Sequence, residues 1–143
     1  MARSVQWLMI PLMIIGGSAA GAAGGIKINT FVALGRGMKR ALRGENVGRG
    51  FAIGLIWVSA YLVAMVVFFL LLLAAAPQLS VERVFFEAVS ALSNVGLSHD
   101  VIGASGQAEM DVLIVAMLVG RLLPLGMLWW MALTAKEAEM PVG

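Results

Sequence analysis

The sequence predicts an all-α, polytopic membrane protein in which two short helices enter the bilayer without crossing it. Of its 143 residues, 61% are hydrophobic and only 13% are charged, whereas soluble domains average about 45–50% apolar and about 25% charged residues. No charged residue occurs between Arg49 and Glu82. That interval exceeds the roughly 20 apolar residues that cross a bilayer, so at least one helix spans the membrane there.

The first segment is an apolar stretch at residues 5–15, followed by the sequence "GGSAAGAAGGIK" at residues 16–27. The stretch at 5–15 is too short to span a membrane and has the length typical of a re-entrant helix. After it, no side chain larger than serine occurs until Ile26. We therefore expect a half-spanning helix that leads into a turn of nearly bare backbone.

The connection at residues 36–49 orients the chain. It holds five of the ten basic residues, namely Arg36, Lys39, Arg40, Arg43 and Arg49, and the positive-inside rule places such a cluster on the cytoplasmic side. Residues 51–76 then run outward to Pro77, and residues 77–111 lie on the outer side or dip into the membrane from it. Residues 108–135 return inward, so the C-terminus is expected to be cytoplasmic as well.

A second short helix is expected at residues 81–92, followed by the polar, glycine-containing sequence Ser93 to Ser98. The two short helices and their glycine turns form a weak repeat, with about 75 residues between Gly21 and Gly96. Irregular backbone at membrane depth is costly unless it is buried in protein or lines a watery cavity. Backbone carbonyls in such a turn can replace the hydration shell of a cation, so the pattern indicates pore loops.

Three motifs resemble the Trk/Ktr/HKT superfamily of potassium transporters. The sequence "IGGSAAGAAGGIK" at residues 15–27 is similar to the third pore loop of that family, and "FEAVSALSNVGLS" at residues 86–98 is similar to its fourth. The sequence "GRLLPL" at residues 120–125 resembles the last inner helix. The three motifs occur in the family's order and cover almost the whole chain.

The resemblance implies repeats of outer helix, pore helix, filter loop and inner helix. Residues 1–48 would form the third pore repeat without its outer helix, and residues 49–143 the complete fourth repeat, as the C-terminal portion of a longer subunit. The implied function is transmembrane transport of K⁺, with Na⁺ left open, through backbone carbonyls. The expected filter residues are Ala20, Gly21, Val95 and Gly96.

The resemblance also implies a gate. The glycine-rich start of the third inner helix, here Ala23, Gly24 and Gly25, would form a movable loop below the filter, and Arg121 would bind its carbonyls. A charge near the middle of an apolar helix is costly unless it is paired or faces water, although Arg121 also has a purely structural interpretation. Glu87 is expected to hold the second short helix in place or to attract cations toward the mouth, and its other interpretation is a capping or surface carboxylate.

The implied partners are the remaining pore repeats, a second copy in a homodimer, a cytosolic nucleotide-binding regulatory subunit and the lipid of the inner (plasma) membrane. No nucleic acid partner, tightly bound cofactor or resident metal is expected beyond the permeating ion. One departure stands out: the family's third loop carries its filter glycine where this chain has Ala20, with Gly21 following. The choice between K⁺ and Na⁺ therefore stays open.

Two other function classes were weighed. The chain has one histidine and no cysteine, so a nucleophile, base and orienting residue cannot be assembled, and an enzyme is not expected. The main alternative is a small membrane subunit whose glycine pairs, such as Gly17 with Gly21, let two helices pack closely. That alternative gives Gly96 and Arg121 no role.

Overall fold

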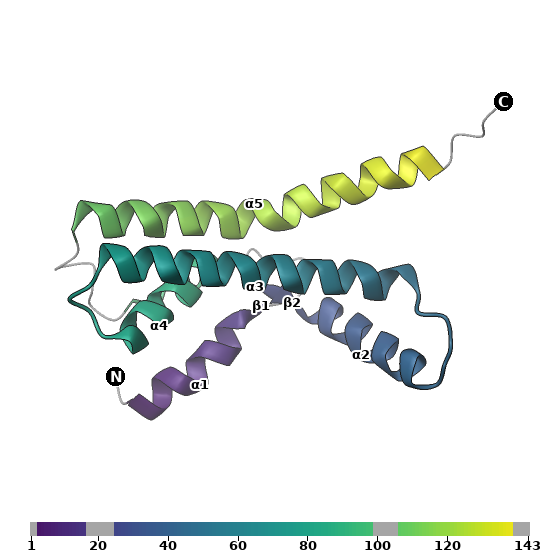
Figure 1. Cartoon of the computed structure of the whole chain (residues 1–143), viewed down its shortest axis with the longest axis horizontal. Coiled ribbons are helices and arrows are strands. Elements are labelled where there is room, and N and C mark those ends of the chain that lie inside the picture. Colours follow the sequence, from purple (N-terminus) through teal and green to yellow (C-terminus); the bar gives the residue numbers. More distant parts are fainter. Residues whose placement is uncertain (1–2, 17–24, 99–105, 139–143) are drawn as a thin grey trace.

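The computed structural model describes residues 3–16, 25–98 and 106–138 of the chain (Figure 1). Within these ranges the chain is helical apart from turns and one short parallel strand pair. The elements in chain order are α1 (Arg3–Ile14), β1 (Ile15–Gly16), β2 (Ile26–Lys27), α2 (Ile28–Leu42), α3 (Arg49–Ala75), α4 (Val81–Leu92) and α5 (Gln107–Ala138).

The two long helices α3 and α5 lie side by side and run in opposite directions (Figure 1). In the part of the chain that the structure describes, α3 is the one helix that is both long and apolar enough to cross a membrane. Helix α5 has 32 residues, which corresponds to roughly 48 Å, and carries Arg121 near its middle. These helices match the predicted segments 51–76 and 108–135, and the all-α class is confirmed.

The two short helices α1 and α4 start near the end of the molecule where α3 ends and α5 begins, and both stop halfway along the long helices (Figure 1). Helix α4 has the bounds that the sequence predicts, Val81–Leu92. Its 12 residues correspond to roughly 18 Å, less than half the length of α3. Helix α4 packs on α3, α5 and α1, so it is inserted among the other helices without traversing their length.

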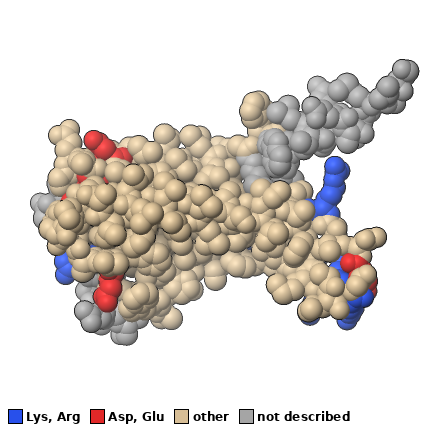
Figure 2. Space-filling model, viewed as in Figure 1, with Lys and Arg blue, Asp and Glu red and all other residues tan. Residues whose placement is uncertain are grey.

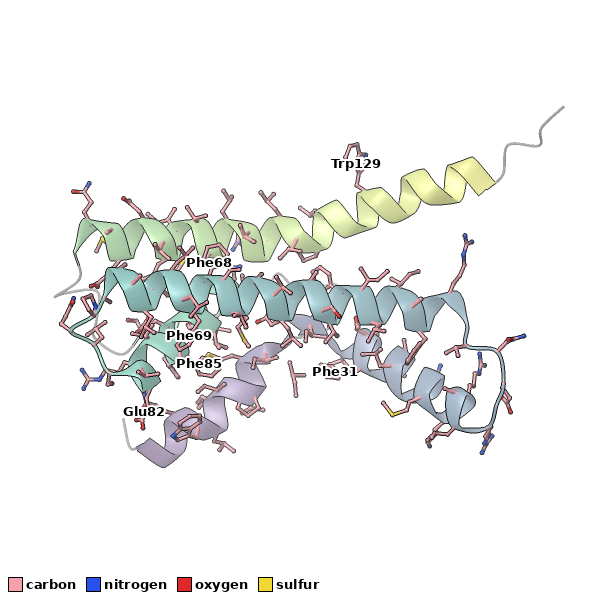
Figure 3. The ribbon with its side chains drawn as sticks, viewed as in Figure 1. Phe31, Phe68, Phe69, Glu82, Phe85 and Trp129 are labelled. Atoms are coloured by element: carbon pink, nitrogen blue, oxygen red, sulfur yellow. The ribbon has the colours of Figure 1, made fainter. Side chains whose placement is uncertain are left out.

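Burial of apolar side chains around α4 holds this arrangement together. Nearly every residue from Val84 to Leu92 is buried, and Val84, Ala88 and Leu92 belong to one cluster with side chains of both long helices. Phe85 and Phe69 of α3 meet edge to face, with ring centroids 5.5 Å apart (Figure 3). A second cluster joins α1 to the other face of α4 through Ile10, Met13, Phe86 and Val89.

Helix α2 lies against the first half of α3 through two glycines. A Cβ at Gly37 would overlap the ring of Phe51, and a Cβ at Gly54 would touch Leu34 and Thr30 at 3.4 Å. The missing side chains thus leave room for Phe51 of α3 and for Leu34 and Thr30 of α2 where the two helices pack together. This contact places α2 at the end of the molecule opposite α1 and α4.

Charged side chains lie at the two ends of the face shown in Figure 2, and its middle is free of them. Most basic residues gather at the end formed by α2 and its connection to α3. The five basic residues from Arg36 to Arg49 are all exposed there. Most of the visible acidic residues lie at the other end, where α4 and α5 begin. An apolar middle between two charged ends is the distribution expected of a protein that spans a bilayer.

Candidate functional site

The loop after α4 has a backbone conformation that few sequences tolerate. Asn94 has a φ of 53° and Gly96 a φ of 78°, so two left-handed residues flank Val95. Asparagine and glycine are the residues that adopt this conformation most readily. A Cβ at Gly96 would meet no atom within 4 Å, so the torsion, and not crowding, requires glycine there. Both Val95 and Gly96 are exposed.

The same loop folds back along α4 and is bonded to it. The hydroxyl of Ser90 donates to the carbonyl oxygen of Leu97 at 2.6 Å, and the N–H of Val95 donates to the carbonyl of Ser90 at 3.1 Å. The hydroxyl of Ser98 donates to Oε1 of Glu87 at 2.9 Å. Glu87 is only 6% exposed. Its carboxylate therefore holds the part of the loop that returns along α4, whereas the sequence suggests that Glu87 holds the short helix itself or attracts cations.

Both long helices also contact the start of the loop, close to the middle of each. On α3, the hydroxyl of Tyr61 lies 2.7 Å from Oγ of Ser93, and both residues are buried. On α5, the carbonyl of Met117 accepts a hydrogen bond from Nδ2 of Asn94 at 3.1 Å. One turn further along α5, Gly120 lies directly against the carbonyl of Leu92. The loop thus stands at mid-depth of the two long helices.

The first loop is closed at its base by the strand pair. Strands β1 and β2 are parallel, with Ile15 opposite Ile26 and Gly16 opposite Lys27. Ile26 is 2% exposed and packs in the same cluster as Trp57 and Tyr61. The strand pair at the base of the first loop therefore also lies at the middle of α3, as Figure 1 shows.

Several predicted site residues fall in this first loop. Ala20, Gly21, Ala23 and Gly24 lie outside the described residues, so their roles stay predictions. Gly25 is described: it is buried and has a φ of 82°, a torsion that favours glycine. The chain thus passes through a left-handed residue immediately before it enters β2.

Arg121 follows Gly120 in the turn of α5 that touches the end of α4. Its side chain is exposed, and it makes no hydrogen bond or ion pair to a residue that the structure describes. Its predicted bonds to the carbonyls of residues 22–25 fall mainly on undescribed residues and remain a prediction. Of the predicted site residues, the structure therefore places Val95 and Gly96 together in one loop, and it places Arg121 next to Gly120, which contacts the end of α4.

Sequence analysis missed three residues that build the site: Tyr61, Ser90 and Met117. Tyr61 is the single tyrosine of the chain and has apolar neighbours on both sides along α3. A buried hydroxyl requires a hydrogen-bond partner, so Tyr61 was the available signal that α3 faces a polar group at mid-depth. Met117 acts through its backbone carbonyl, which no sequence pattern reveals.

The chemistry of this site is that of oxygen groups. The C-terminal ends of α1 and α4 converge at mid-depth, and such ends carry partial negative charge that favours a cation. Among the residues that the structure describes, no group of three or more histidine, aspartate or glutamate side chains is placed to hold a metal ion. The oxygen groups at this loop are backbone carbonyls and hydroxyls, together with the carboxylate of Glu87.

The sequence profile of the TrkH cation transport proteins matches residues 1–137 of the chain. The chain is also similar to Ktr system potassium uptake protein B of Vibrio alginolyticus, with 30% identity over 138 residues. That match covers 87% of this chain and 29% of the relative, so the chain corresponds to less than a third of that protein's length. By its helical architecture and by the profile match over nearly its whole length, the chain belongs to the TrkH family of cation transport proteins.

Proposed function

We propose that this chain supplies two of the filter segments of a potassium transport pathway in the cell membrane, and that it acts in transport and not in catalysis. In this proposal residues 1–48 are the third pore repeat without its outer helix, and residues 49–143 are the fourth. Two segments do not enclose a pore, so the remaining repeats complete it. The potassium uptake named for the Vibrio relative supports K⁺ as the transported ion.

One observation supports the proposal above all: the loop from Ser93 to Ser98 is polar and irregular, and it stands at mid-depth between two long apolar helices. Backbone polar groups at that depth are tolerated only where protein or a water-filled cavity satisfies them. The loop's outward bonds go to α3, α4 and α5, but Val95 and Gly96 at its tip remain exposed. An ion pathway on that side of the loop gives the exposed backbone a partner.

The proposed ligands are the carbonyl oxygens of Val95 and Gly96 in this loop and of Ala20 and Gly21 in the first. Carbonyl oxygens of this kind take over the hydration shell of a permeating cation. The convergence of the C-terminal ends of α1 and α4 adds favourable potential for a cation at the same level. The gate in this proposal is formed by Ala23, Gly24 and Gly25 with Arg121, and its test is given in the Discussion.

The proposed orientation places the connection at 36–49 and the C-terminus in the cytoplasm. The name of the Vibrio relative refers to a Ktr system, which supports a complex with further subunits. Our proposal for this chain includes a homodimer and a cytosolic nucleotide-binding regulatory subunit. The alternative is a small subunit that acts only in helix association. This alternative has no specific support, because it does not explain why a polar loop lies at mid-depth.

The substitution Gly96→Ser tests the proposal. It is made in a complete subunit, in which this chain is joined to the other pore repeats, and K⁺ and Na⁺ uptake are measured in a bacterium that lacks its own potassium uptake. Serine at a φ of 78° is strained, so the carbonyls turn and K⁺ over Na⁺ discrimination falls. Gly106→Ser is the matched control, because position 106 is exposed and open. Unchanged uptake and discrimination in Gly96→Ser would refute the proposal.

A further inference from the structure

The hydrogen bond between Tyr61 and Ser93 joins the middle of α3 to the residue from which the second loop departs. The two oxygens are 2.7 Å apart, Tyr61 is 1% exposed and Ser93 is 0% exposed. Ser93 is the C-cap of α4: its N–H donates to the carbonyl of Val89 at 2.9 Å, and the next two N–H groups close the helix end on the carbonyls of Ala91 and Ser90. The helical torsions end at Ser93, because Asn94 already has a positive φ, so the position of Ser93 sets the origin of the loop.

The surroundings of this bond are apolar. Tyr61 packs in a cluster of apolar side chains that includes Trp57, Leu92 and Ala116. A hydrogen bond in such a setting is electrostatically stronger than one in water. A phenol ring is also rigid, because it has only two side-chain torsions. The backbone of α3 therefore determines where the Tyr61 hydroxyl stands, and that hydroxyl determines where Ser93 stands.

Hydrogen bonds from α3, α4 and α5 hold different parts of the loop. Ser90 and Glu87 of α4 hold the returning limb at Leu97 and Ser98. Asn94 is bonded to the backbone of α5. Among the described residues, Tyr61 provides the side-chain hydrogen bond that comes from α3. Loss of this bond frees the origin of the loop on one side only, which tilts the loop without releasing it.

We infer that Tyr61 is a positioning residue for ion selectivity: by fixing Ser93, it sets the direction in which the carbonyls of Val95 and Gly96 face the ion. This inference rests on the proposed function, because it requires that the loop line the ion path. Tyr61 itself does not touch the ion. It acts through the loop, at a distance of two to three residues along the chain.

The experiment measures the ratio of K⁺ to Na⁺ uptake, normalised to the amount of folded protein in the membrane, in complete subunits. Tyr61→Phe removes the hydroxyl and keeps the ring, and Ser93→Ala removes the other oxygen without altering α3. We expect each variant to lower the ratio about three- to tenfold, the range that corresponds to one buried hydrogen bond. The double variant is expected to equal either single variant, because each already lacks the bond.

Ser59→Ala is the matched control. Ser59 is a hydroxyl residue on the same helix, but it is exposed and lines an apolar groove between α3 and α5, away from the loop. A merely structural role for Tyr61 would lower the amount of folded protein and leave the uptake ratio at the wild-type value. That result, or additive effects in the double variant, would overturn the inference. An altered ratio in Gly96→Ser with an unaltered ratio in Tyr61→Phe would reject the role of Tyr61 alone and leave the proposed function standing.

Discussion

Gly120 of α5 lies against the carbonyl oxygen of Leu92, the last residue of α4, so that two backbones meet with no side chain between them. A Cβ at position 120 would overlap that oxygen and would stand 2.9 Å from Nδ2 of Asn94. The missing side chain thus lets α5 reach the end of the short helix, and it also leaves room for the Asn94 amide to reach the carbonyl of Met117.

Replacement of Gly120 by alanine is expected to destabilise the fold by about 1–3 kcal/mol, the usual cost of forcing a methyl group into a packed contact. The measurement is thermal or denaturant unfolding in detergent. Gly126→Ala is the matched control on the same helix, since a Cβ there meets open space and alanine is favoured over glycine in a helix by about 0.5–1 kcal/mol. Equal stability of the two variants would contradict the close contact.

Asn94→Asp keeps the shape of the side chain and removes the amide that donates to Met117. Aspartate also tolerates a positive φ, so the backbone itself is not penalised. A carboxylate oxygen placed near the Met117 carbonyl loses the bond and gains repulsion, and we expect a loss of about 1–3 kcal/mol in unfolding free energy. The control is Asn29→Asp in the first turn of α2, an exposed position. A loss no larger than in the control would show that this bond does not hold the loop.

The orientation of the chain is tested with single cysteines, which is convenient because the chain has none of its own. Arg43→Cys and Gln107→Cys both lie at exposed positions, on opposite ends of the long helix pair. We expect an impermeant thiol reagent applied from outside to label position 107 only, and position 43 to react after the membrane is opened. Labelling of both positions from the same side would remove the crossing by α3.

The gate hypothesis predicts that Arg121→Ala raises ion flux in a complete subunit. A guanidinium that bonds to loop carbonyls stabilises the closed state, and loss of one charge-assisted bond, worth about 1.5–3 kcal/mol, shifts that equilibrium toward the open state. We expect a rise of about tenfold where closed subunits predominate. Arg83→Ala removes an exposed charge near the start of α4 and should leave flux unchanged. If Arg121→Ala leaves flux unchanged, or only reduces the amount of folded protein, Arg121 is a structural charge.

The fold could be predicted from the sequence because the bilayer restricts the choices. The uncharged interval after Arg49 and the short apolar run from Val81 to Leu92 have lengths that correspond directly to a spanning and a half-spanning helix. The bounds of α4 were therefore predicted to the residue. The polar, glycine-containing sequence from Ser93 to Ser98 likewise indicated an irregular turn.

The hydrogen bonds and packing contacts that hold the loop after α4 could not be predicted in the same way. Tyr61 and Ser93 are 32 residues apart, and their pairing depends on the relative height of two helices, which no local pattern encodes. Gly120 was noticed as part of a motif, but its contact with Leu92 arises only when α5 packs on α4. The bond from Asn94 to Met117 uses a backbone acceptor, whose availability is independent of the side chain at that position.

The bend in α5 divides this helix into two halves that have different neighbours. Pro124 has no N–H to offer the carbonyl of Gly120, four residues earlier, so the helical ladder is interrupted there. In Figure 1 the half of α5 beyond this point turns away from α3, whereas the half before it stays packed on α3 and α4. In the proposed function, a rotation of the half beyond Pro124 would change the spacing of the helices at the end opposite α4, without disturbing the bonds that hold Asn94 and Ser93. Under that proposal, access to the pathway and discrimination among ions would be controlled by separate parts of the chain, with Arg121 three residues before the proline.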